Sequence, residues 1–242
     1  MQFHAIQCWE PSNINDPMMR AAEQLYEQTL DPDERIPWMW IEKSVSGGSK
    51  PGGWRKHLIL AAPGGAAASP EQLAGYLYGA FIPGYGGYLC YVGVAEWARR
   101  MGVATELYEA FYAAMRADAQ AADEPLPFVI WESHRPDDDP KLWNARVRLF
   151  ERVGGLWIEG VDFLAPNFSE EADEPVPLQL FVKPMDKPAA AFHEQRLRGV
   201  IHGLHERVYR IDEGDPLYDG TMTLGCRPRL VPARLAAALL SV

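Results

Sequence analysis

The sequence predicts an α/β (α+β) fold, in which a central sheet is flanked by helices and followed by a C-terminal helical extension. Three observations predict it. Apolar strand patterns alternate with amphipathic segments over residues 1–185. The strand at 88–94 is apolar or aromatic on both faces, as in the middle of a covered sheet, and leads into a long helix. After Pro184 a long apolar stripe at helical spacing begins.

The remaining elements follow in order. Helices are expected at 17–30, from 103 onward, from 140 to 153 and from 187 to 211, and strands at 3–9, 57–62, 73–82, 88–94, 127–132, 156–165 and 176–183. Asp139 and Pro140 supply the N-cap and first turn of the third helix, and Gly154 and Gly155 end it. Residues 44–53 have the composition of a flexible loop, 214–242 read as a tail broken by prolines, and the form of 36–41 is left open.

The composition limits the classes of function. The chain has 242 residues, of which 48% are hydrophobic, so it can bury a sizeable core. Its formal net charge of −10 disfavours nucleic acid as a partner. The acidity either attracts a cationic substrate such as an amine or only keeps the protein soluble.

Three features of the sequence bear on the cellular location of the protein. No apolar run of about 18 residues predicts a membrane span, and the first residues lack a signal-peptide pattern. The cysteines Cys8, Cys90 and Cys226 are widely spaced, so they suggest neither a disulfide framework nor a zinc site. We therefore expect a cytoplasmic protein without a metal.

The most informative stretch is the turn between the strand at 88–94 and the helix that follows it. A helix start leaves main-chain N–H groups without partners, and together with the helix dipole they favour an anion. Arg99 and Arg100 add positive charge, and Gly102 allows a ligand to approach the backbone. This turn predicts a site for a phosphate or diphosphate group.

Two motifs carry a resemblance to a known family. The turn reads Arg99-x-x-Gly102-x-Ala104, and a later helix ends in Arg148-Leu-Phe-Glu-Arg-Val-Gly-Gly155. Together with the order of the elements, they resemble the GNAT superfamily of acyl-CoA-dependent N-acyltransferases over about residues 1–185. The resemblance implies a mostly antiparallel central sheet whose fourth and fifth strands are parallel and splay apart. It also implies a GNAT-like domain at 1–185, with 186–242 as an extension that packs on the domain or on a partner subunit.

The resemblance further implies acetyl-CoA as co-substrate, lying between the strands at 88–94 and 127–132. The backbone of Val92 and Val94 would pair with the pantetheine arm, and Asn144 is a further candidate contact, one residue from the usual slot. The N–H groups of the turn would hold the diphosphate; these residues are Arg99, Arg100, Met101, Gly102, Val103 and Ala104.

The implied reaction is transfer of an acetyl group to a primary amine of a small molecule or a protein, by direct attack in a ternary complex. Such transfer needs a base for the amine and a proton for the leaving thiolate. Glu132 is the first candidate base, against a strand-end ion pair, and Glu96 is the second. The usual tyrosine acid is replaced by Phe150. Either Tyr88 or His134 donates the proton, against ordinary packing for both, or the thiolate leaves without a donor.

Several readings stay open. Because Phe150 has no hydroxyl, the alternative function is an acyl-CoA-binding module with little or no catalysis. His202 and His205 lack a visible third metal ligand, so we expect a solvated or intersubunit face there. The apolar stripe at 197–211 must be covered by the main body or by a second copy, so a homodimer is one possibility. Trp38 and Trp40 fall where the family carries a substrate-covering loop.

Overall fold

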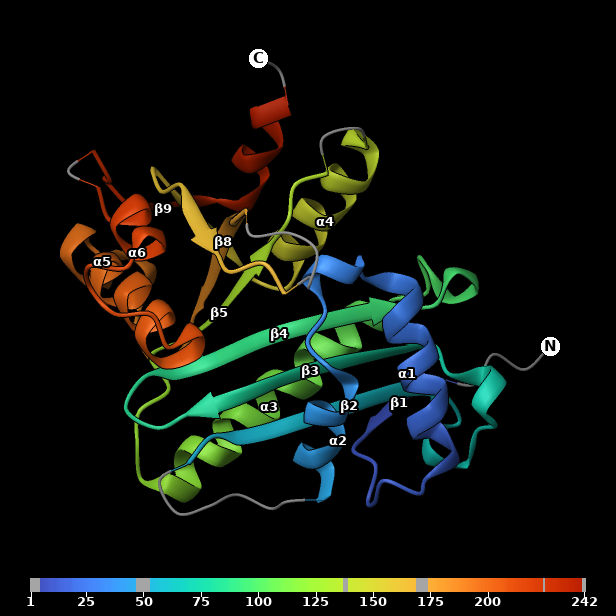
Figure 1. Ribbon diagram of the computed structural model, residues 1–242. Coiled ribbons are helices and arrows are strands. Elements are labelled where there is room, and N and C mark those ends of the chain that lie inside the picture. Colours follow the sequence, from blue (N-terminus) through green and yellow to red (C-terminus); the bar gives the residue numbers. More distant parts are fainter. Residues whose placement is uncertain (1–4, 47–52, 137–138, 169–173, 224, 241–242) are drawn as a thin grey trace. The chain divides into compact units, whose positions relative to one another are not determined.

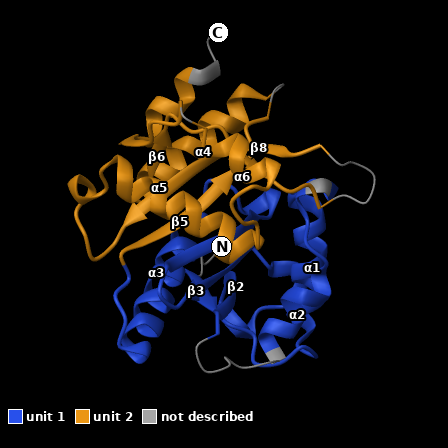
Figure 2. Ribbon diagram, turned by 60° about the vertical axis from the view of Figure 1, so that its left-hand side comes forward, with its two compact units in different colours: residues 1–126 blue, residues 127–242 orange. Residues whose placement is uncertain are grey.

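The computed structural model describes residues 5–46, 53–136, 139–168, 174–223 and 225–240 (Figure 1). The chain forms two compact units, residues 1–126 and 127–242 (Figure 2). The predicted division after residue 185 stays a prediction about the extent of the family domain. Among the described residues, no helix has the length and apolar character needed to cross a bilayer.

The first unit is built on an antiparallel meander. Its strands pair in chain order, with β3 buried along its whole length; they are β1 (Ile6–Trp9), β2 (Arg55–Pro63), β3 (Gly75–Ile82) and β4 (Gly86–Val94). The turn between β3 and β4 contains Gly84, whose φ of 70° suits glycine. β3 and β4 therefore form the covered centre of this unit.

Helices cover both faces of this meander (Figure 1). α1 (Pro17–Thr29) and α2 (Trp38–Ser46) lie on one face and α3 (Val103–Ala122) on the other. A Cβ atom on Gly79 of β3 would lie 2.5 Å from the Phe111 ring of α3, so this glycine lets the helix pack closely. α2 resolves the open form of 36–41 and extends into the expected loop at 44–53, of which 47–52 lie outside the described residues.

β4 contains a bulge that the alternation of residues in the sequence does not predict. Tyr78 pairs with Tyr91 and Gly79 with Leu89, so Cys90 is an extra residue without a partner on β3. The bulge reverses the alternation of side chains along β4. Tyr91 therefore shares a face with Tyr78, toward α1 and α2, whereas Val92 and Val94 face the α3 side.

Within the second unit the strands pair antiparallel. β8 (Val176–Pro184) pairs with β5 (Phe128–Ser133), β6 (Leu156–Glu159) and β7 (Phe163–Ala165), and β9 (Arg229–Pro232) pairs with β6. α4 (Pro140–Arg152) begins as expected, because the Asp139 side chain accepts a hydrogen bond from the N–H of Leu142. An aromatic core lies between α4 and the strands; it comprises Trp131, Trp143, Phe150 and Phe181.

Three expectations about this unit are wrong. The strand expected at 156–165 is two strands, because Gly160 has a φ of 82° between them, where a Cβ atom would lie 2.5 Å from the carbonyl oxygen of Arg227. The helix expected from 187 begins only at Glu194, since Pro188 is extended and His193 is the N-cap. The expected tail contributes β9, the short helix α6 (Pro216–Thr221) and a 3₁₀ segment at Ala233–Leu240.

The expected long helix is also interrupted. α5 (Glu194–Gly203) continues into a π-helical turn at Leu204–Tyr209, which ends at Arg210 with a φ of 61°. Short 3₁₀ turns occupy Pro32–Glu34, Gly65–Ala67, Pro70–Gln72, Glu96–Ala98 and Ala189–Ala191. A π-helical turn such as the one at Leu204–Tyr209 is rare, and such turns often lie at functional sites.

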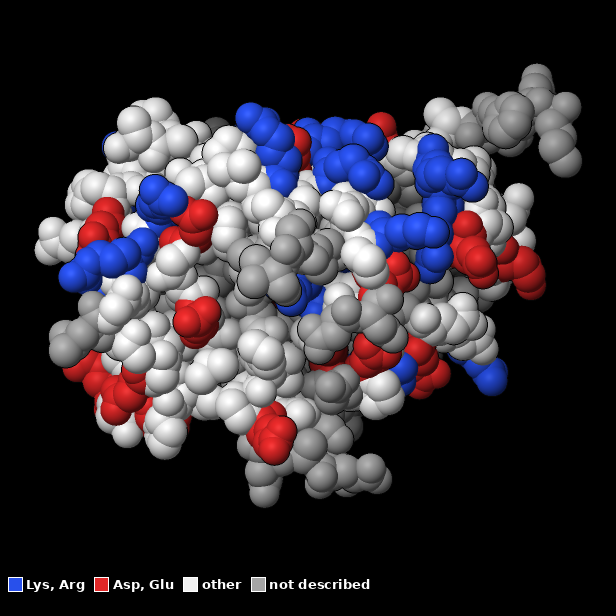
Figure 3. Space-filling view, turned by 90° about the horizontal axis from the view of Figure 1, so that it is seen from above, with Lys and Arg blue, Asp and Glu red and all other residues white. Residues whose placement is uncertain are grey.

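The charge of the chain is distributed over its surface in both signs. On the face drawn in Figure 3, Lys and Arg side chains occur beside Asp and Glu side chains. An excess of 33 acidic over 23 basic residues is therefore compatible with local basic positions such as Arg99 and Arg100, which are both exposed.

Candidate active site

The turn between β4 and α3 has the main-chain form that the sequence predicts. After the 3₁₀ turn Glu96–Ala98, Arg100 adopts a left-handed φ of 67° and Gly102 a φ of 86°. Arg99, Arg100 and Gly102 are exposed, and Met101 is 42% exposed. By contrast Val103 is 1% exposed and anchors the start of α3 in the core.

At this turn, main-chain donors without a partner inside the helix lie beside an open space. The N–H of Glu106 donates to the carbonyl of Gly102, and this bond is the first of α3. The N–H groups of residues 102–105 precede it and have no partner within the helix. A Cβ atom added to Gly102 would meet nothing within 4 Å, so the space above this glycine is open. The arrangement fits a diphosphate group, which needs several convergent donors and close access to the backbone.

The end of β4 leads directly to this turn. Val92 and Val94 are half-buried, and Gly93 between them has no room for a side chain, since a Cβ there would lie 2.3 Å from the Tyr76 ring. Bulges are common next to active sites, because they redirect side chains and interrupt pairing. The bulge at Cys90 thus divides the pairing of β4 with β3 into two parts, and Val92 and Val94 lie in the second part, opposite Leu77 and Gly75.

Tyrosines gather on the opposite face of the meander, under α1 and α2. Register puts Tyr76, Tyr78, Tyr88 and Tyr91 on this face, and Tyr88 is 6% exposed. Burial raises the pKa of the Tyr91 phenol far above its usual value, so it stays protonated. Its hydroxyl donates to the carbonyl of Glu34 and accepts from the N–H of Ile36.

The same cluster fastens the segment between α1 and α2. The hydroxyl of Tyr26 donates to the carbonyl of Ile36 at 2.9 Å, and its ring lies 5.5 Å from that of Trp38. Trp40 and Met39 stay exposed at 49% and 53%. The segment at 34–38 is therefore tied to β4, while the following residues present apolar side chains outward.

In the second unit, the candidate base Glu132 lies near the end of β5. It is half-buried, and its Oε1 atom accepts a hydrogen bond from the hydroxyl of Tyr209. Tyr209 was missed by sequence reasoning, because nothing in a local pattern pairs residues 77 positions apart. Glu96, the second candidate, is exposed in the first unit.

Other predicted residues of the second unit have structural partners. Asn144 is half-buried and its Nδ2 donates to the carbonyl of Pro140 within α4. The carbonyl of His134 accepts from Arg146 at 2.8 Å. Phe150 is 5% exposed and lies against Phe181 with ring centroids 4.6 Å apart, so this position is part of the core.

Of the two histidines for which a solvated or intersubunit face is expected, His202 has a side chain that is 41% exposed, whereas His205 is buried. His202 shares a hydrogen bond of 3.0 Å with the hydroxyl of Tyr218. His205 is fully buried against Phe163, and neither ring nitrogen has a hydrogen-bond partner in the described part of the chain. Burial lowers its pKa to about 4, so its ring is neutral at pH 7. The described residues contain no cluster of potential metal ligands.

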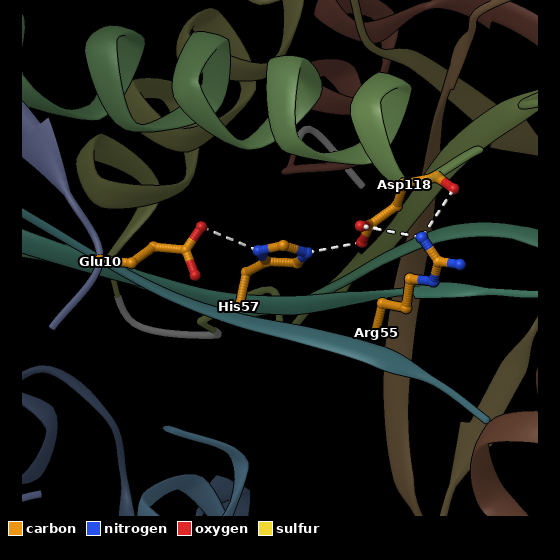
Figure 4. A network of polar contacts seen from close by, with 4 residues as sticks. All are labelled: Glu10, Arg55, His57 and Asp118. Carbon is orange, nitrogen blue, oxygen red and sulfur yellow. Dashed lines mark hydrogen bonds and ion pairs between the residues drawn. The ribbon is translucent and has the colours of Figure 1, made fainter. Parts of the chain in front are cut away.

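A second titratable cluster in the first unit joins β2, α3 and the segment after β1 (Figure 4). His57 of β2 lies between the carboxylates of Glu10 and Asp118, and Arg55 also pairs with Asp118 at 3.5 Å. Because both ring nitrogens face carboxylates, the imidazole has no lone pair available to act as a base. We interpret this cluster as an ion network that fastens α3 to the sheet.

Comparisons with known proteins identify the domain. Residues 19–124 match the model of the acetyltransferase (GNAT) family. A solved structure from Bacteroides thetaiotaomicron, described as a GNAT-family acetyltransferase, has a TM-score of 0.55 and 15% identity over 85% of this chain and 99% of its own. No curated protein matches the chain in sequence.

Two further structures were also compared. The ribosomal-protein-S18-alanine N-acetyltransferase from Escherichia coli has a TM-score of 0.49 and 10% identity over 76% of this chain and 96% of its own. Ard1 from Thermoplasma volcanium has a TM-score of 0.48 and 16% identity over 76% and 99%. The family match and the Bacteroides structure confirm the predicted mixed, mostly antiparallel fold, and residues 19–124 are the part of the chain that matches the GNAT acetyltransferase family.

Proposed function

We propose that this protein is an acetyl-CoA-dependent N-acetyltransferase that acts on a primary amine of a small molecule or a protein. The open turn between β4 and α3 carries the proposal. It combines a glycine at φ 86° with space above it, N–H groups at 102–105 that have no partner within the helix, and the exposed Arg99 and Arg100. Membership of the GNAT family supports acetyl-CoA as the anion-bearing partner of this turn.

The chemistry would be direct attack in a ternary complex. A neutral amine nitrogen forms a bond to the thioester carbonyl carbon, the carbon–sulfur bond breaks, and the thiolate takes up a proton. Main-chain N–H groups near Val92 and Val94 would pair with the pantetheine arm and polarise the carbonyl. Glu132 would accept the proton of the amine, and Tyr88 is the proposed donor to the thiolate.

Two measurements test this proposal in sequence. A ligand at a hundredfold excess over its Kd stabilises the native state by about 2.7 kcal/mol, so acetyl-CoA should raise the melting temperature clearly. Release of free thiol over a panel of primary amines then identifies the acceptor. A shift with ATP or NAD but none with CoA or acetyl-CoA would contradict the proposal.

A second candidate function is an acyl-CoA-binding module with little or no catalysis. The buried Phe150 supports it, because this side chain stands where the family commonly has a proton-donating tyrosine. The module would show the same thermal shift with acetyl-CoA. It would release no thiol with any amine, and this readout separates the two functions.

A further inference from the structure

We propose that Tyr209 is a positioning residue for Glu132, so that the C-terminal region supplies part of the acid–base apparatus. The inference rests on the proposed function, in which Glu132 is the base. Tyr209 lies outside residues 19–124, which match the family model. Its role would therefore lie outside the part of the chain that matches the family model.

The contact itself is the first argument. The Tyr209 hydroxyl donates to Oε1 of Glu132, although the two residues are 77 positions apart. A hydrogen bond to a charged acceptor is stronger than one between neutral groups. Glutamate has three rotatable side-chain bonds, so a fixed donor at one oxygen limits the orientations of the carboxylate. A catalytic base needs such a restricted orientation, because proton transfer depends on the alignment of the accepting oxygen.

The second argument is the way the Tyr209 ring is held. Its centroid lies 6.0 Å from that of Phe163 in β7, 6.5 Å from that of Phe168 and, within its own π-helical turn, 6.5 Å from that of His205. Packed aromatic side chains have few accessible rotamers, so the direction of the hydroxyl is defined. A donor held in this way can restrict its partner without losing much entropy of its own.

The third argument is the backbone that carries Tyr209. It is the last residue of the π-helical turn, which closes with the N–H groups of Arg210 and Ile211 donating to the carbonyl of His205. Arg210 has a φ of 61°, a conformation that costs energy for residues other than glycine. Local strain of this kind persists where the surrounding structure requires it and is frequent at functional sites.

The first experiment tests the contact without any activity. Urea unfolding of the wild type, Tyr209→Phe, Glu132→Gln and the double variant forms a thermodynamic cycle. A contact gives a non-additive change in unfolding free energy, and additivity would overturn the proposal. Tyr218→Phe replaces Tyr209→Phe in a control cycle, because Tyr218 is in the same cluster but bonds His202 and Glu213 instead.

The second experiment tests positioning with the amine acceptor found in the thiol-release panel. We expect Tyr209→Phe to lower kcat about tenfold with the KM for acetyl-CoA unchanged, and to have no further effect in the Glu132→Gln background. Tyr218→Phe should keep the wild-type kcat. Equal kcat values for the two phenylalanine variants would overturn positioning and leave acetyl transfer intact. A wild-type kcat in Glu132→Gln would instead remove Glu132 as the base, and the positioning role with it.

Discussion

The Nε2 atom of His57 lies 2.7 Å from Oδ2 of Asp118, and the Nδ1 atom of the same ring lies 2.9 Å from Oε1 of Glu10. Burial lowers the pKa of His57, but the hydrogen bonds and charges of the two carboxylates outweigh it and raise the pKa above 6.5. The imidazolium form is therefore the one that links β2 to α3 and to the segment after β1.

This arrangement makes stability depend on pH near neutrality. A group whose pKa is raised by folding stabilises the protein below its unfolded pKa, and this contribution is lost as the pH rises through the folded pKa. We expect the unfolding free energy of the wild type to fall as the pH rises above about 6.5, relative to His57→Gln. Urea unfolding of both proteins at a series of pH values from below to above 6.5 measures this fall.

The two carboxylates provide matched controls. The side chain of Asp118 is 17% exposed and that of Glu10 is 49% exposed, so solvent screens Glu10 more. Asp118→Asn should weaken the pH dependence more than Glu10→Gln does. A wild type whose stability relative to His57→Gln rises with pH over this range would contradict the assignment.

His205 gives a pH dependence of the opposite sign. Burial lowers its pKa from 6.5 to about 4, so the unfolded chain binds a proton that the folded chain excludes. The contribution of neutral His205 to the unfolding free energy is therefore fully present above pH 6.5. It is lost as the pH falls toward 4, by up to about 3 kcal/mol. Urea unfolding between pH 8 and pH 4 measures this loss.

His205→Leu tests the origin of this loss. Because neither ring nitrogen of His205 has a hydrogen-bond partner in the described part of the chain, leucine should be neutral or stabilising by about 1 kcal/mol at pH 8. It should also remove the loss below pH 6.5. His202→Leu is the control, because the His202 side chain is 41% exposed. Equal acid sensitivity of the two leucine variants would show that another group is responsible.

The sequence predicts the framework of this fold well, because strand and helix periodicities are local. α1 is expected at 17–30 and observed at Pro17–Thr29, and the Asp139 cap of α4 is found as expected. The bulge at Cys90 is invisible to a period of two, which would put Tyr88, Cys90 and Val92 on one face. The sequence does not predict β9, because Pro228 precedes this four-residue strand and Pro232 ends it, and its partner β6 lies about 70 positions earlier in the chain.

The candidate site likewise has one part that the sequence predicts and another that it does not. The turn with Arg100 and Gly102 is a local feature and follows from the residues that form it. The Tyr209 contact to Glu132 depends on a π-helical turn and on chain closure over 77 positions, and no local pattern encodes either. The roles of Glu132, Tyr88 and Asn144 stay predictions.

Phe150→Tyr tests whether the missing tyrosine limits the reaction. Phe150 is 5% exposed, with its ring 4.6 Å from Phe181 and 5.6 Å from Trp131. A hydroxyl placed among these rings would lose its water without an evident partner, so we expect about 1–3 kcal/mol of destabilisation and no gain in kcat. Thiol release and urea unfolding measure both effects. A variant with a higher kcat would show that this position reaches the leaving group.

Gly102→Val tests the proposed diphosphate turn. A Cβ at Gly102 meets nothing within 4 Å in the protein, so the side chain would occupy only the open space that we assign to the ligand. Its φ of 86° adds about 1 kcal/mol or more of backbone strain. Gly64 has the same φ of 86° and the same open surroundings, so Gly64→Val carries equal strain at a position away from the turn.

The two valine variants therefore separate ligand exclusion from strain. We expect both to lower the melting temperature by similar amounts, and only Gly102→Val to lose the stabilisation by acetyl-CoA, with at least a hundredfold weaker Kd. Isothermal titration with acetyl-CoA measures the affinity directly. If Gly102→Val binds as tightly as Gly64→Val, the diphosphate is held elsewhere, because a valine side chain and a diphosphate cannot share the space above residue 102.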